Sequence, residues 1–362
     1  MNVPADRLGI LGGRVELDGS HGEGGGQIVR TACALSALTG VSCRISNIRG
    51  GRKQPGLRPQ HCAALSGLAS LCGAETSPIQ VGTTEVSFAP GALRAAALDL
   101  DTGTAGSIGL VLQSLLLAGM GLPGPWRALI RGGTDVPASP SCDYIQNVKA
   151  VILARMGYRV GLRILRRGYY PKGGGIVQVQ LDPPEGLLEG LDLPVATETT
   201  GSYGVSHASS GLSQRRVAER QRRQAVKGLT DLLHIPSKIA VEYGPTRSAG
   251  SGLVVWARTI DSVAGASSLG APQKSAEQVA DEAVEMLMRT YHTRASIDPW
   301  LGDQILPYMA LSRGPTVISV PYLTRHMQTN MWVIQRFLNV RFGCEEQEQR
   351  IRIECRPQDS RP

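Results

Sequence analysis

The chain has 362 residues, which suits two domains or one large domain with an insert, and 42% of them are hydrophobic, so it can bury a substantial core. A net charge of +8 is compatible with nucleic acid, anionic metabolites or a membrane surface as partners. It is equally compatible with the absence of any specific partner. Seven cysteines without a CxxC pair exclude a disulfide framework and a cysteine zinc site, and they predict a reducing compartment. The most apolar stretch, residues 108–122, is too short to cross a bilayer. We therefore expect a cytoplasmic protein without a membrane partner.

Helix-like and strand-like segments alternate along the first part of the chain. In the helix-like segments apolar residues recur about every 3.6 positions, and in the strand-like segments they alternate with polar residues. The helix-like segments span residues 27–40, 59–73, 106–119 and 143–157, and strand-like residues follow each of them. The same succession returns near the C-terminus, at residues 276–323 and 329–355. We predict an α/β fold in which a repeated α/β unit is used about three times.

The composition changes between about residues 184 and 275. A polar segment rich in Ser, Thr and Gly is followed by a basic helix candidate, residues 215–227, which carries six cations and the single acid Glu219. This helix is either a solvated face or an RNA contact, and the sequence leaves both open. Two strand-like segments complete the region. We predict a large domain formed by residues 1–184 and 277–362, interrupted by a smaller inserted α/β domain at residues 185–276.

A glycine-rich loop around Glu23 opens a stretch that points to an anion. From Gly24 to Ala74 there is no acid. The six cations of this stretch are Arg30, Arg44, Arg49, Arg52, Lys53 and Arg58. Phosphate suits such a cluster, because the planar guanidinium matches its oxygens and a glycine loop exposes backbone N–H groups. A solvated basic loop is the alternative for residues 49–58, whereas Arg30 lies in an apolar helix pattern, where an unpaired charge is costly.

Two further polar residues are candidates for the site. Gln113 interrupts the most apolar helix pattern, as either a buried amide or a ligand contact. His326 follows a strand and precedes a helix, which is where α/β proteins place reactive groups. No acid occurs between Asp303 and Glu345, so a carboxylate that orients His326 has to come from elsewhere in the chain. A second triple glycine, in "RGYYPKGGG" from Arg167, is by itself typical of a turn between strands.

Taken together, these segments resemble the RNA 3′-terminal phosphate cyclase family from about Val15 onward. The resemblance includes the specific pattern RGxxPxGGGx[IV] and the segments "DGSHGEGGGQIVR", "IRGGRKQPGLRPQH", "GTAGSIGLVLQ", "GGTDVPASPSCDY", "GASSLG", "LGDQILPYMAL" and "TRHMQTN". It implies three repeated α/β units and an insert of thioredoxin-like topology. It also implies an ATP-dependent ligase that forms phosphoric ester bonds. Such an enzyme converts an RNA 3′-phosphate into a 2′,3′-cyclic phosphate through a histidine–AMP intermediate and an RNA 3′-adenylate, and it releases AMP and pyrophosphate.

The resemblance also implies roles for individual residues. The nucleophile falls on His326, and Glu23 helps to hold a divalent metal, Mg or Mn. The other nucleotide and phosphate contacts fall on Arg30, Arg49, Arg52, Gln60 and Gln113. The adenosine-contacting stretch matches Trp300, Leu301, Gly302, Asp303 and Gln304, although Gly302 stands where the family has alanine. The implied partner is RNA with a 3′-terminal phosphate, and the oligomeric state stays open, with a homodimer as one option.

Three other functions remain to be weighed against this expectation. A catalytically inactive relative that acts in ribosome assembly would lack the histidine. A plain RNA-binding scaffold would use the basic insert without consuming ATP. An enolpyruvyl transferase, with distantly similar α/β units, would not need a histidine nucleophile. His326 and the ordered motifs therefore favour the cyclase.

Overall fold

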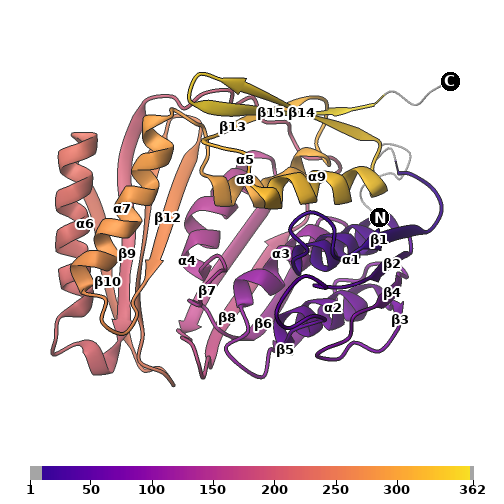
Figure 1. Cartoon of the computed structure of the whole chain (residues 1–362), viewed down its shortest axis with the longest axis horizontal. Coiled ribbons are helices and arrows are strands. Elements are labelled where there is room, and N and C mark those ends of the chain that lie inside the picture. The colour runs from indigo at the N-terminus through magenta and orange to yellow at the C-terminus, as the bar shows by residue number, and fades with distance from the viewer. Residues whose placement is uncertain (1–9, 359–362) are drawn as a thin grey trace.

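A computed structural model describes residues 10–358 of the chain and shows the predicted mixed α/β architecture, with three sheets in the larger part and one in the insert (Figure 1). Residues 1–9 and 359–362, at the outer ends of the predicted domain bounds, lie outside the described residues. Within residues 10–358 no helix is both long and apolar enough to span a bilayer.

The first repeat is a four-stranded sheet with two helices. Its elements are β1 (Val15–Asp18), α1 (Gln27–Thr39), β2 (Cys43–Ser46), α2 (Pro59–Cys72), β3 (Glu75–Thr76) and β4 (Val86–Ala89). The strand order is β1-β2-β4-β3, with β1 and β2 parallel and the remaining pairs antiparallel. A right-handed crossover through a helix is the usual way to join two parallel neighbours, and α1 provides it here.

The second repeat has the same strand order and directions. Its elements are β5 (Leu98–Asp101), α3 (Ile108–Gly119), β6 (Trp126–Gly132), α4 (Cys142–Tyr144), the π-helical turn η2 (Ile145–Lys149), α5 (Ala150–Arg155), β7 (Arg159–Arg166) and β8 (Gly175–Asp182). The order is β5-β6-β8-β7, with β5 and β6 parallel. Helix α3 therefore occupies the place of α1, and the segment α4–η2–α5 occupies the place of α2.

The third repeat is split by the insert. Its elements are α8 (Pro299–Met309), β13 (Thr316–Val320), α9 (Arg325–Phe337), β14 (Val340–Gln347) and β15 (Arg350–Pro357), with strand order β13-β15-β14. Residues 191–193, which precede the insert, run parallel to β13 and take the place of a first strand: Leu193 N donates to Val317 O at 2.9 Å, and Val317 N donates to Leu191 O at 2.6 Å. Helices α1, α3 and α8 thus hold equivalent positions in three repeats.

The insert has the topology expected of a thioredoxin-like unit. Its elements are β9 (Thr199–Ser209), the short 3₁₀ turn η3 (Ser210–Leu212), α6 (Val217–Leu233), β10 (Ser237–Gly244), β11 (Ser251–Thr259) and β12 (Val263–Leu269), followed by α7 (Ala276–His292). The order is β10-β9-β11-β12, with β9 and β10 parallel and the other pairs antiparallel.

Helix α7 shares a core with α6 and the insert sheet, although it begins where the predicted insert ends. Ala225 and Leu229 of α6 pack in one cluster with Val279 and Ala283 of α7. Beyond this helix the chain returns to the larger part, and the two connections meet where Ala196 N donates to Arg294 O at 2.9 Å. The predicted domain bounds stay a prediction.

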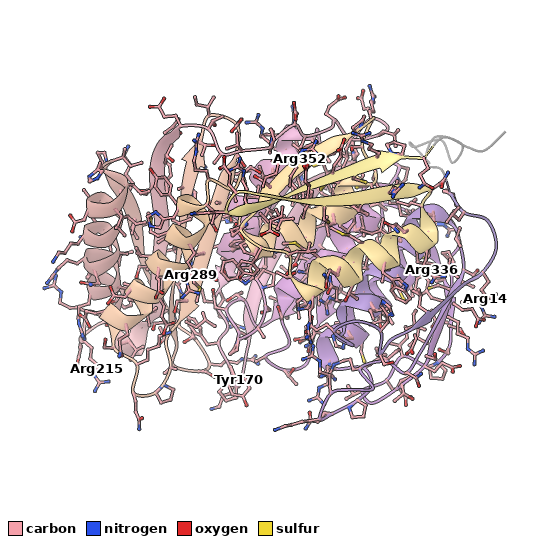
Figure 2. All side chains as sticks on the ribbon, turned by 45° about the horizontal axis from the view of Figure 1, so that its top comes forward. Arg14, Tyr170, Arg215, Arg289, Arg336 and Arg352 are labelled. Carbon is pink, nitrogen blue, oxygen red and sulfur yellow. The ribbon has the colours of Figure 1, made fainter. Side chains whose placement is uncertain are left out.

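The core lies between the three sheets of the larger part. Figure 1 shows α1, α3, α8 and α9 gathered there, with the sheets on the outside. Every residue of α1 is buried, and most of them are apolar, as is typical of a helix inside the core. Charged side chains project outward from the rim, for example Arg14 and, beside the basic helix α6, Arg215 (Figure 2). Of the α6 cations, Arg220 forms an ion pair with Glu277 at 2.6 Å.

Candidate active site

A cavity of about 820 Å³ lies where the three repeats and the insert meet. Ten of the twelve predicted site residues line it: Glu23, Arg30, Arg49, Arg52, Gln60, Gln113, Trp300, Asp303, Gln304 and His326. The other two, Leu301 and Gly302, belong to the same helix but do not line the cavity. Gly302 faces α9, where a Cβ atom would collide with Met327, so its small size serves helix packing. The nucleotide contacts predicted for Leu301 and Gly302 stay a prediction.

Three equivalent helices bring the central residues together. Arg30 comes from α1, Gln113 from α3 and Asp303 from α8. Arg30 Nη2 donates to Gln113 Oε1 at 3.1 Å, so the amide that interrupts the apolar pattern of α3 holds the lone charge of α1. Arg30 is 7% exposed, and burial lowers the pKa of its guanidinium to about 10, so it remains charged near neutral pH. Its Nε has no hydrogen-bond acceptor among the residues described.

His326 lies in the first turn of α9, two residues after the N-cap residue Thr324, whose Oγ1 accepts from Met327 N at 3.0 Å. Gln27 fixes the imidazole. Its Nε2 donates to the carbonyl of His326 at 3.1 Å, which turns its Oε1 toward His326 Nδ1 in a short contact. The proton of a neutral ring therefore belongs on Nδ1, and Nε2 is left with its lone pair facing the cavity.

Glu23 faces that lone pair. Its Oε2 lies 2.6 Å from His326 Nε2, and no hydrogen-bond donor within the described part of the chain is directed at this oxygen. Its Oε1 accepts from Arg52. Burial lowers the pKa of His326, with Arg30 and Arg52 acting in the same direction and Glu23 opposing them. Two lone pairs at this distance repel each other, so the arrangement requires a proton or a cation between the two atoms.

The glycine-rich loop fits tightly around these groups. Gly26 passes so close to His61 that a Cβ atom would collide with its imidazole. Gly22 has a φ of +62°, which favours glycine, and it lies against Thr329 of α9. Thr329 Oγ1 also accepts from Glu23 N at 3.4 Å. The loop thereby places Glu23 next to His326.

The cationic end of the cavity consists of Arg30, Arg49, Arg52 and Arg58. Burial lowers the pKa of Arg49, and the positive charges of Arg58 and Arg52 lower it further. His61 is buried among them and accepts from Arg58 N at 3.0 Å through Nδ1. Burial, followed by Arg30, Arg49 and Arg58, holds its pKa well below the usual range. Of these arginines only Arg52 has a carboxylate partner among the described residues, so the end is built for an anion.

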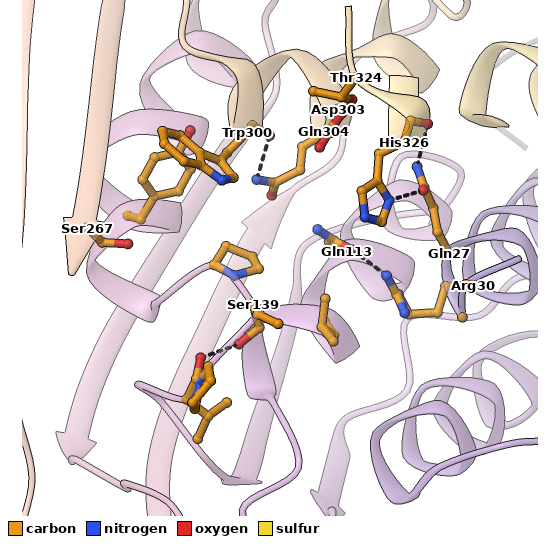
Figure 3. Close-up of a pocket in the computed structure, with 18 of the residues that line it drawn as sticks. Gln27, Arg30, Gln113, Ser139, Ser267, Trp300, Asp303, Gln304, Thr324 and His326 are labelled. Carbon is orange, nitrogen blue, oxygen red and sulfur yellow. Dashed lines mark hydrogen bonds between the residues drawn. The ribbon is translucent and has the colours of Figure 1, made fainter. Parts of the chain in front are cut away.

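The aromatic end consists of Tyr144, Trp300 and Tyr308. Figure 3 shows Trp300 and Ser267 on one side of the cavity and His326, Gln27 and Arg30 on the other. Trp300 is 39% exposed, and its carbonyl accepts from Gln304 Nε2 at 3.0 Å. Asp303 lies between the two ends and is held by Thr324. Burial raises its pKa to about 7, and Asp298 and Glu23 add to the effect.

Sequence reasoning missed several lining residues. His61 was not among the predicted site residues, although its place two residues after Pro59, at a helix start next to the basic cluster, was a usable signal. The sequence around Lys149 gave no indication that this residue lines a cavity. Ser267, Ser268, Leu269 and Gly270 come from the end of β12 and the loop that follows it, so the insert contributes to the cavity wall. Only the tertiary arrangement brings these segments together.

The family pattern around Arg167 lies elsewhere. Arg167 is buried and forms ion pairs with Asp143 at 2.6 Å, Asp135 at 3.3 Å and Glu242 of the insert at 2.6 Å. His207 of the insert lies 3.3 Å from Asp135. Burial acts to raise the pKa of Asp135, but His207 and Arg167 outweigh it, and the pKa falls. Asp135, Asp143 and His207 have the spacing of metal ligands, but Arg167 already forms ion pairs with both carboxylates.

Comparisons with known proteins agree with this geometry. A family model described as RNA 3′-terminal phosphate cyclase matches residues 21–344. Three similar curated proteins, each named RNA 3′-terminal phosphate cyclase, come from archaea. The Methanopyrus kandleri protein is 41% identical over 95% of this chain and 99% of its own length. The Pyrococcus furiosus protein is 44% identical over 89% of this chain and 92% of its own length. The Pyrococcus abyssi protein is 43% identical over 91% of this chain and 95% of its own length. The chain therefore belongs to the RNA 3′-terminal phosphate cyclase family of enzymes, as its motifs predicted.

Proposed function

We propose that the protein uses ATP to convert an RNA 3′-phosphate into a 2′,3′-cyclic phosphate through AMP bound covalently to His326. The observation that carries the proposal is the orientation of His326. Gln27 holds its Nδ1, so the lone pair of Nε2 points into a cavity that has four arginines at one end and aromatic rings at the other. The names of the relatives supply the RNA substrate.

The first step needs a neutral imidazole. Burial keeps the pKa of His326 low, so the ring is neutral near pH 7. Nε2 attacks the α-phosphorus of ATP, a phosphorus–nitrogen bond forms, and the bond to the bridging oxygen breaks with release of pyrophosphate. Arg30, Arg49, Arg52 and Arg58 stabilise the negative charge that gathers on the β- and γ-phosphates.

Glu23 is suited to hold a divalent cation. One of its oxygens is bound by Arg52, and the other lacks a donor and faces the cavity. A carboxylate oxygen completed by phosphate oxygens and water is a typical Mg²⁺ or Mn²⁺ environment. When bound there, the metal would neutralise phosphate charge and draw Glu23 away from His326 Nε2.

Two further steps transfer the adenylate and close the ring. An oxygen of the RNA 3′-phosphate attacks the phosphorus held on His326, the phosphorus–nitrogen bond breaks, and the imidazole is released as the leaving group. The neighbouring 2′-hydroxyl then attacks the RNA phosphorus, AMP leaves, and the hydroxyl proton passes to solvent or to the freed imidazole. Placement of the RNA end beside His326 supplies much of the rate, because it makes the attack on the held adenylate effectively intramolecular. The later attack of the 2′-hydroxyl occurs within the RNA itself.

The test is incubation of the full chain with ATP labelled in the α-phosphate, followed by denaturing electrophoresis. An adduct that is labile to acid and stable to alkali, and that disappears when RNA ending in a 3′-phosphate is added, supports the proposal. An RNA-binding scaffold or an inactive relative forms no adduct. RNA binding without any adduct would contradict the proposal.

The remaining expectations concern the setting of the enzyme. All seven cysteines are free, which fits a reducing compartment and supports the cytoplasm as the location. A homodimer remains one option, and sedimentation of the purified chain decides between monomer and dimer.

A further inference from the structure

Lys149 is a buried lysine without a counter-charge. It ends the π-helical turn η2, is 1% exposed and lines the cavity. Its Nζ lies 5.2 Å from the centroid of the Tyr308 ring. Between residues 10 and 358 no carboxylate forms an ion pair with this ammonium group. Asp298, the acid at the start of α8, is already occupied: Tyr144 Oη, Trp300 N and Leu301 N donate to its Oδ1, and Gly265 N donates to its Oδ2.

This burial destabilises the free protein. Lysine is almost never fully buried unless it is paired, because the ammonium loses its hydration. Burial alone lowers the pKa of Lys149 to about 7, and no neighbouring acid opposes it. The contact with the Tyr308 ring offsets only part of the loss. Methionine would fill much the same volume without burying a charge, so the role of this lysine lies outside the stability of the free chain.

The position of Lys149 indicates which part of a ligand it meets. Tyr308 belongs to α8, as does Trp300, and Tyr144 precedes Lys149 by little more than one turn. Lys149 is therefore part of the aromatic end. Trp300 of this end lies across the cavity from Arg30 and His326 (Figure 3). The other lysine of the cavity wall, Lys274, is paired with Glu282. A π-helical turn at a cavity is also a frequent mark of a functional position.

A nucleotide whose phosphates occupy the cationic end has its base at the aromatic end. The rings of Trp300 and Tyr144 suit the faces of a base, but a base also carries hydrogen-bonding atoms on its edge. The purine ring nitrogens of adenine are acceptors, and an amine or ammonium group supplies the N–H donors they need.

We propose that Lys149 recognises the base of the nucleotide, with its Nζ donating a hydrogen bond to a ring nitrogen of the purine. This inference rests on the proposed use of ATP and adds a specificity-determining residue to it. Lys149 then lowers the stability of the free protein and raises the selectivity of nucleotide binding.

The test compares the wild-type chain with Lys149→Met, using a non-reactive ATP analogue that has a methylene bridge between the α- and β-phosphates. The variant should melt at a higher temperature and bind this analogue about 10- to 100-fold more weakly, the usual loss for a hydrogen bond to a charged group. Inorganic triphosphate, which has no base, should bind both proteins equally well. The matched variant Lys274→Met should discriminate among bases as the wild type does.

A series of analogues identifies the contacted atom. The 1-deaza, 3-deaza and 7-deaza forms each lack one ring nitrogen. One of them should bind the wild type weakly and bind Lys149→Met as well as the parent analogue does. Equal affinity of both proteins for the whole series would overturn the inference, as would a variant less stable than the wild type. A wild-type chain that forms an AMP adduct with ATP itself, in a parallel reaction, shows that such a failure concerns Lys149 alone and leaves the proposed reaction intact.

Discussion

Two clusters of acid, arginine and histidine in this protein contain the same residue types in opposite settings. The open cluster, Glu23, Arg52 and His326, lines the cavity, and one oxygen of Glu23 has no donor among the residues that the structure describes. The closed cluster, Asp135, Asp143, Arg167, His207 and Glu242, is buried except for Glu242, which is 51% exposed, and it joins the second repeat to the insert. Access to the cavity, and not the types of residue, distinguishes a site for chemistry from a cluster that holds two parts of the protein together.

The comparison also shows what a family pattern can and cannot locate. The most specific motif of the sequence, which begins at Arg167, belongs to the closed cluster. It identified the family correctly, yet it marks the contact between the second repeat and the insert. The proposed nucleophile was indicated by a less specific signal, a lone histidine between a strand and a helix.

The largest effect should follow from replacing the proposed nucleophile of the open cluster, His326. His326→Asn should remove the AMP adduct and the cyclisation of RNA entirely, because it removes the neutral lone pair that attacks the α-phosphorus. His292→Asn, at an exposed histidine of α7, is the matched control and should react as the wild type does. RNA that already carries a 3′-adenylated phosphate separates the steps, since His326→Asn should still cyclise it. Mass spectrometry that places AMP on another residue would refute the assignment.

Breaking the closed cluster should affect stability instead. Arg167→Met leaves Asp135 and Asp143 buried without their counter-charge, which should cost about 3–5 kcal/mol of unfolding free energy. Urea denaturation measures this loss. The fraction of the variant that stays folded should still form the adduct, because none of the five residues lines the cavity. Loss of the adduct at unchanged stability would reverse the assignment of the two clusters.

The arginines of the cationic end come next. Arg30→Ala and Arg52→Ala should each raise the barrier to adenylation by about 2–4 kcal/mol, because each removes a charged donor from the phosphates. Arg44→Ala is the matched control from the same acid-free stretch: its partner is Glu85, at 2.9 Å, and it does not line the cavity. Single-turnover kinetics should separate the three variants. Equal rates in all of them would show that position in the cavity does not matter.

The smallest effect concerns pH. The pKa of His326 is lowered in the folded protein, so the neutral nucleophile persists below the usual histidine range and adenylation is lost only as the pH falls through the lowered value. Glu23 acts to raise this pKa, so Glu23→Gln should move the acid limb of the normalised rate profile to lower pH, by up to about 1 unit. An acid limb that moves to higher pH would contradict this account of the open cluster.

The repeats and most of the site could be predicted from sequence because their signals are local. The periodicity of apolar residues indicated α1, α2 and α3, and a run of cations without any acid indicated Arg30 and Arg52. Lys149 could not be predicted, because its burial depends on α8, far along the chain, and on a π-helical turn that a period of 3.6 does not reveal. Residues 191–193 were missed as a strand for a similar reason. Their partner β13 lies beyond the whole insert, and pairing across such a distance leaves no local pattern.

The hydrogen bond between Ala196 and Arg294 brings the two connections of the insert together. The segment between these two residues is therefore an exchangeable unit, which we call the cassette. Because the two connections touch, the segment between them can be exchanged or replaced by a short linker without moving residues 191–193 or α8 from the third sheet. The segment between the two connections includes α7, which shares a core with α6. Since its β12 loop forms part of the cavity wall, an exchanged cassette would change that wall while the three repeats and His326 stayed as they are. Variation in this one segment therefore offers evolution, or a protein engineer, a way to alter the walls of the cavity without altering its chemistry.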